Sequence, residues 1–305
     1  MQSFLPRWLI PAATLLMGMG SVQAQAPGGP PAAQPAGPLT THSLTPTVYW
    51  VEGGVGNTGF IVGRQGVVVI DATISEPAAR LLLAEVAKVT PKPVTTVILT
   101  HGDGDHVNGL GAFPAGVTVI AHPANKARLA AAVAAGRSRI PADKLPNHTV
   151  ASREVLDGDG VKIELLHWAP AHTDGDLVVF LPEQKIVFGG DILAMNQFRA
   201  LIHDQQGGTS EGWVTSMQAM LALDADRYVV GHGDLHARPA LQERLRLVMD
   251  ERARIRQLVG QGKSLAEIQA TVGDPPPAQT TAPGEPRFPP FSAVVYQELT
   301  GPAKK

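Results

Sequence analysis

The chain has 305 residues, of which 44% are hydrophobic and 17% charged, a composition typical of a folded protein and not of a disordered one. Its 25 basic and 27 acidic residues give a formal charge of −2, so there is no basic excess to neutralise phosphates and we expect no nucleic-acid partner. The absence of cysteine excludes disulfides, a cysteine nucleophile and thiolate metal sites. The ten histidines are the remaining soft nitrogen ligands.

Residues 1–24 have the pattern of a secretory signal peptide. Arg7 supplies a positive charge, residues 8–20 form an uncharged and largely apolar run, and small residues precede a predicted cut after Ala24. The run contains Pro11 and is shorter than the roughly 20 residues that a bilayer-spanning helix needs, so we expect no stable membrane insertion after cleavage. The sequence therefore predicts a periplasmic or secreted protein.

Residues 25–43, rich in Pro, Gly and Ala at their start, predict a disordered linker to the folded unit. Strand and helix patterns then alternate through residues 44–236, which predicts an α/β sandwich in a single domain. Strands are predicted at 48–51, 58–62, 67–70, 94–99, 117–121, 161–167, 177–181, 185–188 and 227–230. Helices are predicted at 76–89, 124–135 and 210–223, and a loop at 136–149.

Residues 237–305 predict C-terminal helices at about 239–259 and 265–272, a Pro-rich stretch, and a last helix or docking segment at 291–299. The apolar stripe of the first helix favours packing on the domain's own sheet face. The same stripe would also suit a dimer, so the oligomeric state stays open.

Potential metal ligands crowd the end of the strand predicted at 94–99. His101, Asp103, Asp105 and His106 follow it within six residues and alternate with glycines. Because glycine tolerates positive φ, such a loop can turn several side chains towards one point. Imidazole and carboxylate together suit Zn, Fe or Mn.

Three further strand ends carry the same kinds of side chain beside glycine. His172 lies between two predicted strands, Asp191 follows the strand at 185–188, and His232 follows the strand at 227–230. Four strand ends that present ligands are the arrangement that a metal site on the rim of a sheet sandwich requires. The sequence therefore predicts a metal centre there.

These motifs, in this order, resemble those of the metallo-β-lactamase superfamily over roughly residues 44–236. The His-x-His-x-Asp-His signature of that family corresponds to His101-x-Asp103-x-Asp105-His106. The resemblance implies an αββα metallo-β-lactamase-type sandwich. It also implies that Asp71, at the end of the strand at 67–70, supports the signature loop from outside the metal sphere.

The resemblance further implies two metal ions per chain, one held by His101, Asp103 and His172 and the other by Asp105, His106 and His232, with Asp191 between them. A hydroxide held by the ions would attack a carbonyl. Asp105 would orient that nucleophile as well as bind metal, and is the predicted catalytic residue.

The chain departs from the family pattern at Asp103, which stands where the signature has its second histidine. A carboxylate is harder than imidazole and negatively charged, so it favours less soft ions. We expect two Zn²⁺ ions, with Fe or Mn as alternatives. A weakened first site, with one metal performing most of the chemistry, is a further alternative.

Three more residues are predicted to touch substrate. His122 ends the strand at 117–121, where the family often has a residue lining the site. Arg199 and His203 lie on the segment after Asp191 that normally borders the active-site mouth, and Arg199 would hold a substrate carboxylate.

These features predict an exported metal-dependent hydrolase that cleaves an ester, lactone, thioester or amide bond of a small molecule. A β-lactamase proper is one alternative, which export favours, although one zinc β-lactamase branch has Cys where this chain has Asp191. The other alternative is a non-catalytic metal- or ligand-binding protein with a degenerate site, which Asp103 favours.

Overall fold

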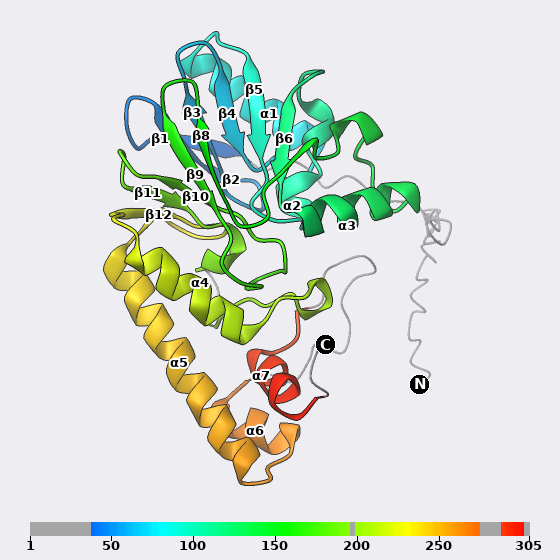
Figure 1. The fold of residues 1–305 in the computed structure, drawn as a ribbon, viewed down its shortest axis with the longest axis vertical. Helices are drawn as coiled ribbons and strands as arrows, with labels where there is room; N and C mark the ends of the chain where they lie inside the picture. The colour runs from blue at the N-terminus through cyan, green and yellow to red at the C-terminus, as the bar shows by residue number, and fades with distance from the viewer. Residues whose placement is uncertain (1–37, 196–198, 275–287, 302–305) are drawn as a thin grey trace, which may run out of the picture.

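Two β-sheets lie face to face between layers of helices in the computed structural model, which describes residues 38–195, 199–274 and 288–301 (Figure 1). This αββα arrangement confirms the predicted fold class. The predicted signal peptide and most of the predicted linker lie outside the described residues.

The first sheet has seven strands that follow one another in chain order. They are β1 (Leu39–Ser43), β2 (Val48–Gly53), β3 (Thr58–Val62), β4 (Val67–Ile70), β5 (Val94–Ile98), β6 (Thr118–Ala121) and β7 (His148–Thr149). Strands β1 to β4 pair antiparallel, whereas β4 to β7 run parallel. The carboxyl ends of β4, β5 and β6 therefore meet at one edge of the sheet.

The second sheet has six strands in the order β13-β12-β11-β10-β9-β8. They are β8 (Arg153–Asp157), β9 (Lys162–Leu166), β10 (Val178–Leu181), β11 (Ile186–Phe188), β12 (Arg227–Val229) and β13 (His236–Ala237). Only β11 and β12 pair in parallel among the strands of this sheet, so both end at the same edge.

Alternation of side chains along the strands builds the layers. In β4, Val68 and Ile70 point into the core between the two sheets, whereas Val67 and Val69 point outwards. The outward side chains pack with Leu82 of α1 (Glu76–Val89), and α3 (Pro123–Ala134) covers the same face. The first sheet is therefore buried on both faces.

The outer face of the second sheet is covered by α4 (Ser210–Ala222) and α5 (Arg238–Gly260). Leu241 and Val248 of α5 share a core with Trp213 of α4. Helix α5 continues beyond the sheets and carries α6 (Leu265–Val272) and α7 (Phe291–Thr300) at its far end (Figure 1).

The structure differs from the sequence prediction at edge elements. Residues 39–43, predicted as linker, form β1 on β2, and residues 153–157 form β8, which was not predicted. Both are edge strands with polar side chains, so neither has the apolar run that reveals a buried strand. The predicted loop at 136–149 contains a short 3-10 turn at Ala142–Lys144 and ends in β7.

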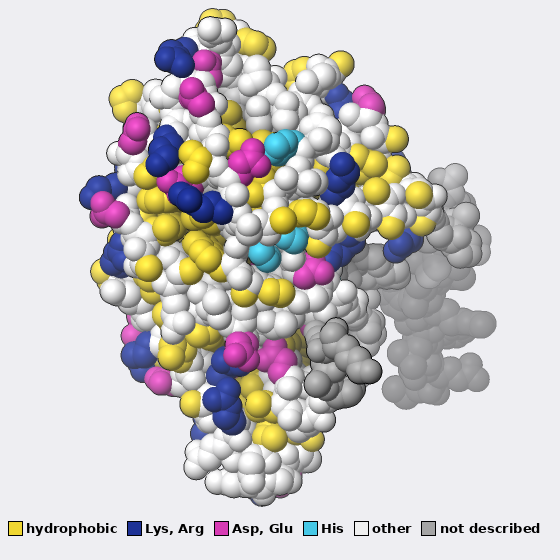
Figure 2. All heavy atoms as spheres, in the orientation of Figure 1, with side chains coloured by type: hydrophobic (Ala, Val, Ile, Leu, Met, Phe, Trp, Pro, Cys, Tyr) yellow, Lys and Arg dark blue, Asp and Glu magenta, His cyan; other side chains and the backbone are white. Residues whose placement is uncertain are grey.

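The described part of the chain contains no helix with the length and apolar character needed to cross a bilayer. On the face drawn in Figure 2, acidic and basic side chains are interspersed, and histidines lie near its middle.

Candidate metal centre

Loops at the carboxyl ends of strands from both sheets bring the predicted ligands together. The loop after β5 turns into the short helix α2 (Gly104–Val107) and carries the signature residues. His172 lies in the loop between β9 and β10, Asp191 in the 3-10 turn Gly190–Leu193 after β11, and His232 after β12. The seven predicted ligands are His101, Asp103, Asp105, His106, His172, Asp191 and His232, and all meet at this edge.

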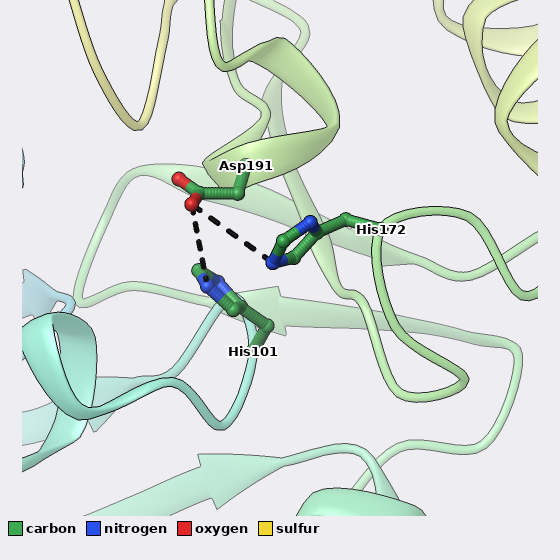
Figure 3. Close-up of side chains that lie close together, drawn as sticks. All are labelled: His101, His172 and Asp191. Atoms are coloured by element: carbon green, nitrogen blue, oxygen red, sulfur yellow. Dashed lines mark ion pairs between the residues drawn. The ribbon is translucent and has the colours of Figure 1, made fainter. Parts of the chain in front are cut away.

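The first cluster is centred on His101, Asp103 and His172. Asp103 Oδ2 lies 3.8 Å from His101 Nε2 and 3.1 Å from His172 Nε2. Asp191 faces both histidines in Figure 3, with its Oδ2 atom 3.8 Å from His101 Nε2 and 3.9 Å from His172 Nε2. Four potential ligand atoms thus surround one point.

The second cluster comprises Asp105, His106 and His232. Asp105 Oδ2 lies 3.4 Å from His106 Nε2 and 3.1 Å from His232 Nε2. Asp191 reaches this cluster too, because its Oδ1 atom is 3.3 Å from His106 Nε2 and its Oδ2 atom is 3.2 Å from His232 Nε2. The Asp191 carboxylate therefore borders both clusters.

The geometry of the side chains fits metal ions. Zinc–ligand bonds of about 2.1 Å place tetrahedral ligand atoms about 3.4 Å apart, in the range of the distances above. Among the described residues, His101 Nε2, His106 Nε2 and Asp191 Oδ1 are buried without a hydrogen-bond partner. Buried polar atoms are normally paired, so three unpaired atoms directed at one place fit a bound cation.

In His101, His106 and His172, the Nδ1 atom is held by a neighbouring group, which directs Nε2 at the centre. Asp71 Oδ2 lies 2.8 Å from His106 Nδ1 and accepts a 2.7 Å hydrogen bond from Thr100 Oγ1. Thr100 Oγ1 lies 3.0 Å from His101 Nδ1. His172 Nδ1 lies 3.0 Å from the Leu201 carbonyl oxygen. Asp71 thus supports two ligands at once.

Asp71 adopts a left-handed backbone conformation with a φ of 65° at the end of β4. Its Oδ1 atom also accepts the Thr100 amide at 2.7 Å. A non-glycine residue is rarely found in this conformation, and such strain concentrates at functional sites. The backbone turn brings the carboxylate under the signature loop.

Glycine is required where the backbone approaches the centre closely. A Cβ atom on Gly231 would lie 1.9 Å from Asp191 Oδ1, and one on Gly56 would lie 3.0 Å from His106 Nε2. Any side chain at Gly231 would therefore displace the carboxylate that borders both clusters.

The site holds its carboxylates ionised and most of its histidines protonated when no metal competes. Burial opposes the charge of His172, but its hydrogen bond with Asp103 and the charge of Asp191 outweigh burial and raise its pKa to about 9. Burial also opposes the charge of His232, but Asp191 and Asp105 raise its pKa to about 10. Burial and the charge of His106 lower the pKa of His101 to about 4.

The centre is open on one side. The side chains of Asp105 and His232 are 19% and 16% exposed, whereas those of His101 and Asp191 are 1% and 3% exposed. The second cluster, where Asp105 faces solvent, is therefore the accessible side of the centre.

His203, predicted as a substrate residue, lies against the first cluster, with Nδ1 3.0 Å from Asp103 Oδ1. Gln206 joins it, because its side-chain amide contacts both Asp103 and His203. The ring of Phe288, from the segment before α7, lies 5.1 Å from that of His203 and 5.8 Å from that of His172. Gln206 and Phe288 were not predicted from the sequence, because they follow no apolar strand and belong to no motif.

The loop that carries His172 is held by two further residues that were not predicted from the sequence. Asp176 is buried and accepts hydrogen bonds from the amide and the hydroxyl of Thr173. Burial raises the pKa of Asp176 to about 6. Asn125 of α3 donates a 2.6 Å hydrogen bond to the carbonyl of Gly175. The sequence signal for Asp176 was its place in the His172-Thr173-Asp174-Gly175-Asp176 turn.

The structure places the other two predicted substrate residues in structural contacts. His122 caps α3 by accepting the amide of Ala124 at 3.2 Å, and its ring stacks on that of His167. Arg199 forms ion pairs of 2.6 Å with Glu251 and 3.2 Å with Asp274. These contacts tie Arg199 to α5 and to the end of α6.

Comparisons with known proteins agree with this architecture. Residues 51–232 match the metallo-β-lactamase superfamily. The chain is 30% identical over 199 residues to the 2,4-dinitroanisole O-demethylase subunit alpha of Nocardioides sp., covering 64% of this chain and 57% of that protein. It is 23% identical over 233 residues to a linear primary-alkylsulfatase of Pseudomonas sp., covering 62% and 44%. The chain thus spans about half the length of these two relatives.

A metallo-β-lactamase type 2 of Bacteroides fragilis is 28% identical over 202 residues, covering 64% of this chain and 75% of that protein. Among solved structures, a sec-alkylsulfatase from Pseudomonas sp. superimposes with a TM-score of 0.67 at 19% identity, covering 86% of this chain and 50% of that one. A metallo-β-lactamase from Pontibacter korlensis gives 0.59 at 22% identity, covering 70% and 99%. The chain belongs to the metallo-β-lactamase superfamily.

Proposed function

We propose that the protein is a metal-dependent hydrolase that cleaves an ester, lactone, thioester or amide bond of a small molecule. The observation that supports this most directly is the position of Asp191, whose carboxylate lies within 3.9 Å of ligand nitrogens in both clusters. Such a carboxylate suits two neighbouring ions that act together on one substrate.

Metal ions bound here would supply an activated water and a Lewis acid for the developing negative charge. His101, Asp103 and His172 would hold one ion, and Asp105, His106 and His232 the other. Asp105 has its pKa lowered, since the charge of His106 and the close contacts of Asp105 with the imidazoles of His106 and His232 outweigh its burial. Its ionised carboxylate on the open side is placed to orient an attacking water.

For the metal we propose two zinc ions, with iron or manganese as alternatives. The residues that surround the site offer nitrogen from imidazole and oxygen from carboxylate, and no thiolate is available in this cysteine-free chain. That donor set suits zinc, iron and manganese, and Asp103 increases its oxygen share.

The relatives extend the range of substrate classes to be tested. Their names specify an alkylsulfatase, an O-demethylase of 2,4-dinitroanisole and β-lactamases, which act on different bonds. A panel for this protein therefore includes carboxyl esters, lactones, thioesters, β-lactams, alkyl sulfates and aryl methyl ethers. A β-lactamase proper would cleave only the β-lactams of this panel.

The test is turnover of this panel by protein loaded separately with zinc, manganese or iron. The His106→Ala variant removes a buried ligand, and His148→Ala is the matched control, because His148 pairs with Glu154 away from the signature loop. We expect hydrolysis by the wild type and the control and its loss in His106→Ala. A wild type that holds metal but cleaves no member of the panel would instead be a binding protein.

We further propose that the protein is exported, on the pattern of residues 1–24. Fractionation of cells that produce the full chain tests this, with Arg7→Glu as a variant that removes the positive charge before the apolar run. Cytoplasmic retention of the wild type would overturn the proposal.

A further inference from the structure

The Asp103 side of the centre contains an imidazole that comes from outside the superfamily signature. Asp103 stands where the signature has a histidine, but His203 reaches the same place from 100 residues further along the chain. Its Nδ1 atom lies 3.0 and 3.2 Å from the two carboxylate oxygens of Asp103. Ligand atoms of Asp103, His172 and His203 all lie within 4.8 Å of one another, and all three residues are buried.

Hydrogen bonding alone does not satisfy the polar atoms of Asp103, His203 and Gln206. Gln206 Nε2 lies 2.7 Å from His203 Nδ1 and also contacts Asp103 Oδ1. If His203 Nδ1 accepts a hydrogen bond from the Gln206 amide, it carries no proton. It then has nothing to donate to the Asp103 carboxylate, and two electron-rich atoms are in contact. If Nδ1 instead carries a proton towards Asp103, that proton opposes the amide N–H. Turning the amide would place its oxygen against the carboxylate, so each arrangement leaves one unfavourable contact.

A cation between Asp103, His172 and His203 removes this conflict, because lone pairs of both the imidazole and the carboxylate can then point at it. The backbone holds His203 in place for such a role: its amide donates a 2.8 Å hydrogen bond to the carbonyl of His172. The ring of Phe288, 5.1 Å away, packs on its side. His203 is therefore positioned by its neighbours and not by Asp103 alone.

We propose that His203 binds the metal on the Asp103 side directly through Nδ1, supplying the imidazole that the signature lacks at position 103. The proposal rests on the centre holding metal, as proposed above. With His101, Asp103, His172, Asp191 and His203 around it, this ion is closed to substrate by protein ligands. The open position then belongs to the ion at Asp105 and His232, since closed metal sites are structural and catalytic ones keep a free position.

Zinc affinity, measured by competition with a chromophoric chelator, tests this in His203→Ala and His203→Asn. Asparagine keeps a hydrogen-bond donor near the place of Nδ1 but is a poor zinc ligand. We expect both variants to hold one zinc ion as the wild type does and to bind the other on the order of 100-fold more weakly. The His148→Ala control should bind as the wild type does.

The Co²⁺-substituted proteins give a second readout, because loss of a nitrogen ligand changes the visible absorption of the ion in both His203 variants. Wild-type affinity in His203→Asn, with weakening confined to His203→Ala, would show that His203 acts only by hydrogen bonding and overturn the proposal. Unchanged affinity in both would overturn it as well. Should His203→Ala fail to fold, His203→Asn alone decides between these results. A wild type that binds no metal would instead contradict the proposed function.

Discussion

At the scale of single residues, Asp191 determines whether the two clusters form one centre. Its two oxygens lie 3.2 to 3.9 Å from ligand nitrogens of His101, His106, His172 and His232. Burial opposes its charge, but the histidines around it hold its pKa well below the usual range. An ionised, buried carboxylate among four imidazoles is the arrangement expected of a bridging ligand.

Asp71 has the strongest supporting role, because one carboxylate accepts the Thr100 amide and hydroxyl and meets His106 Nδ1. Asp71→Ala leaves these buried groups without an acceptor, which should lower the free energy of unfolding by at least about 3 kcal/mol. It should also weaken zinc binding by about 10 to 100-fold. Urea denaturation and chelator competition measure the two effects.

Asp71→Asn is the conservative variant to compare with Asp71→Ala, since asparagine tolerates a φ of 65° and keeps one acceptor oxygen. We expect it to recover part of the stability but less of the zinc affinity. Equal stability of Asp71→Ala and the wild type would disprove the supporting role.

Proton release provides a prediction that follows from the pKa values of the histidines. In the metal-free protein the pKa is about 9 for His172 and about 10 for His232, so both imidazoles carry a proton at neutral pH. The charges of Asp105 and Asp191 also raise the pKa of His106 well above its usual value. Metal binds the neutral imidazole, so binding at pH 7 should release at least about two protons from these residues. Apparent affinity should therefore rise with pH from neutrality towards the pKa values of His172 and His232.

Calorimetric titration with zinc in two buffers of different ionisation enthalpy counts the protons. Identical heats in both buffers would mean that no protons are released. The charged histidines assigned to the metal-free centre would then be wrong.

At the scale of elements, the segment that delivers His203 is tied to the C-terminal helices. Arg199 pairs with Glu251 of α5 and with Asp274 just after α6, and donates to the carbonyl of Val272. The side chains of Glu251 and Asp274 are 15% and 3% exposed, so loss of the arginine leaves one partly buried and one buried carboxylate without this partner. Through this contact we expect residues beyond the second sheet to affect the metal centre.

Arg199→Ala should lower the free energy of unfolding by about 3 kcal/mol, as expected when one partner of a buried ion pair is removed. It should also weaken zinc binding through His203. Arg246→Ala is the matched control, since Arg246 pairs with Glu243 and Asp250 on the exposed face of α5 and should leave stability nearly unchanged. A raised KM with unchanged stability in Arg199→Ala would restore the alternative in which Arg199 binds substrate.

Elements with strong local signals were predictable from the sequence. Helix α1 begins after the cap at Ser75 and ends at Val89 before Pro91, as its pattern indicates. Edge strands β1 and β8 gave no such signal, because solvent covers part of both faces and their side chains are mixed. Their place in the sheets depends on hairpin pairing with the neighbouring strands β2 and β9, and not on an apolar pattern of their own.

At the scale of the whole molecule, the metal centre joins the two sheets. The signature loop follows β5 of the first sheet, whereas His172, Asp191 and His232 follow strands of the second. The strand-end ligands could be read from the sequence, because each lies next to an apolar run and a glycine. The contacts of three other residues could not be predicted, because each lies in a segment that only the tertiary structure brings to the centre. These residues are His203, Gln206 and Phe288.

Because its ligands come from both sheets, the metal should stabilise the whole fold. Free zinc at about 100 times its dissociation constant contributes about 2.7 kcal/mol per site. For a domain of this size that corresponds to a rise in Tm of about 5 to 10 °C per site. Thermal unfolding measures this rise in three samples: chelator-treated protein alone, with added zinc, and with added calcium as the control ion. An equal Tm in the three samples would contradict a zinc centre that links the sheets.

Metal stoichiometry of the wild type and of Asp191→Asn is the most direct test of the central claim, that two ions share the Asp191 carboxylate. Elemental analysis of zinc-reconstituted protein should give about two ions per chain for the wild type and at most about one for Asp191→Asn. Asp224→Asn, which changes an exposed carboxylate, should retain about two. A wild-type value near zero, or an Asp191→Asn variant that still holds two ions as tightly, would contradict the account.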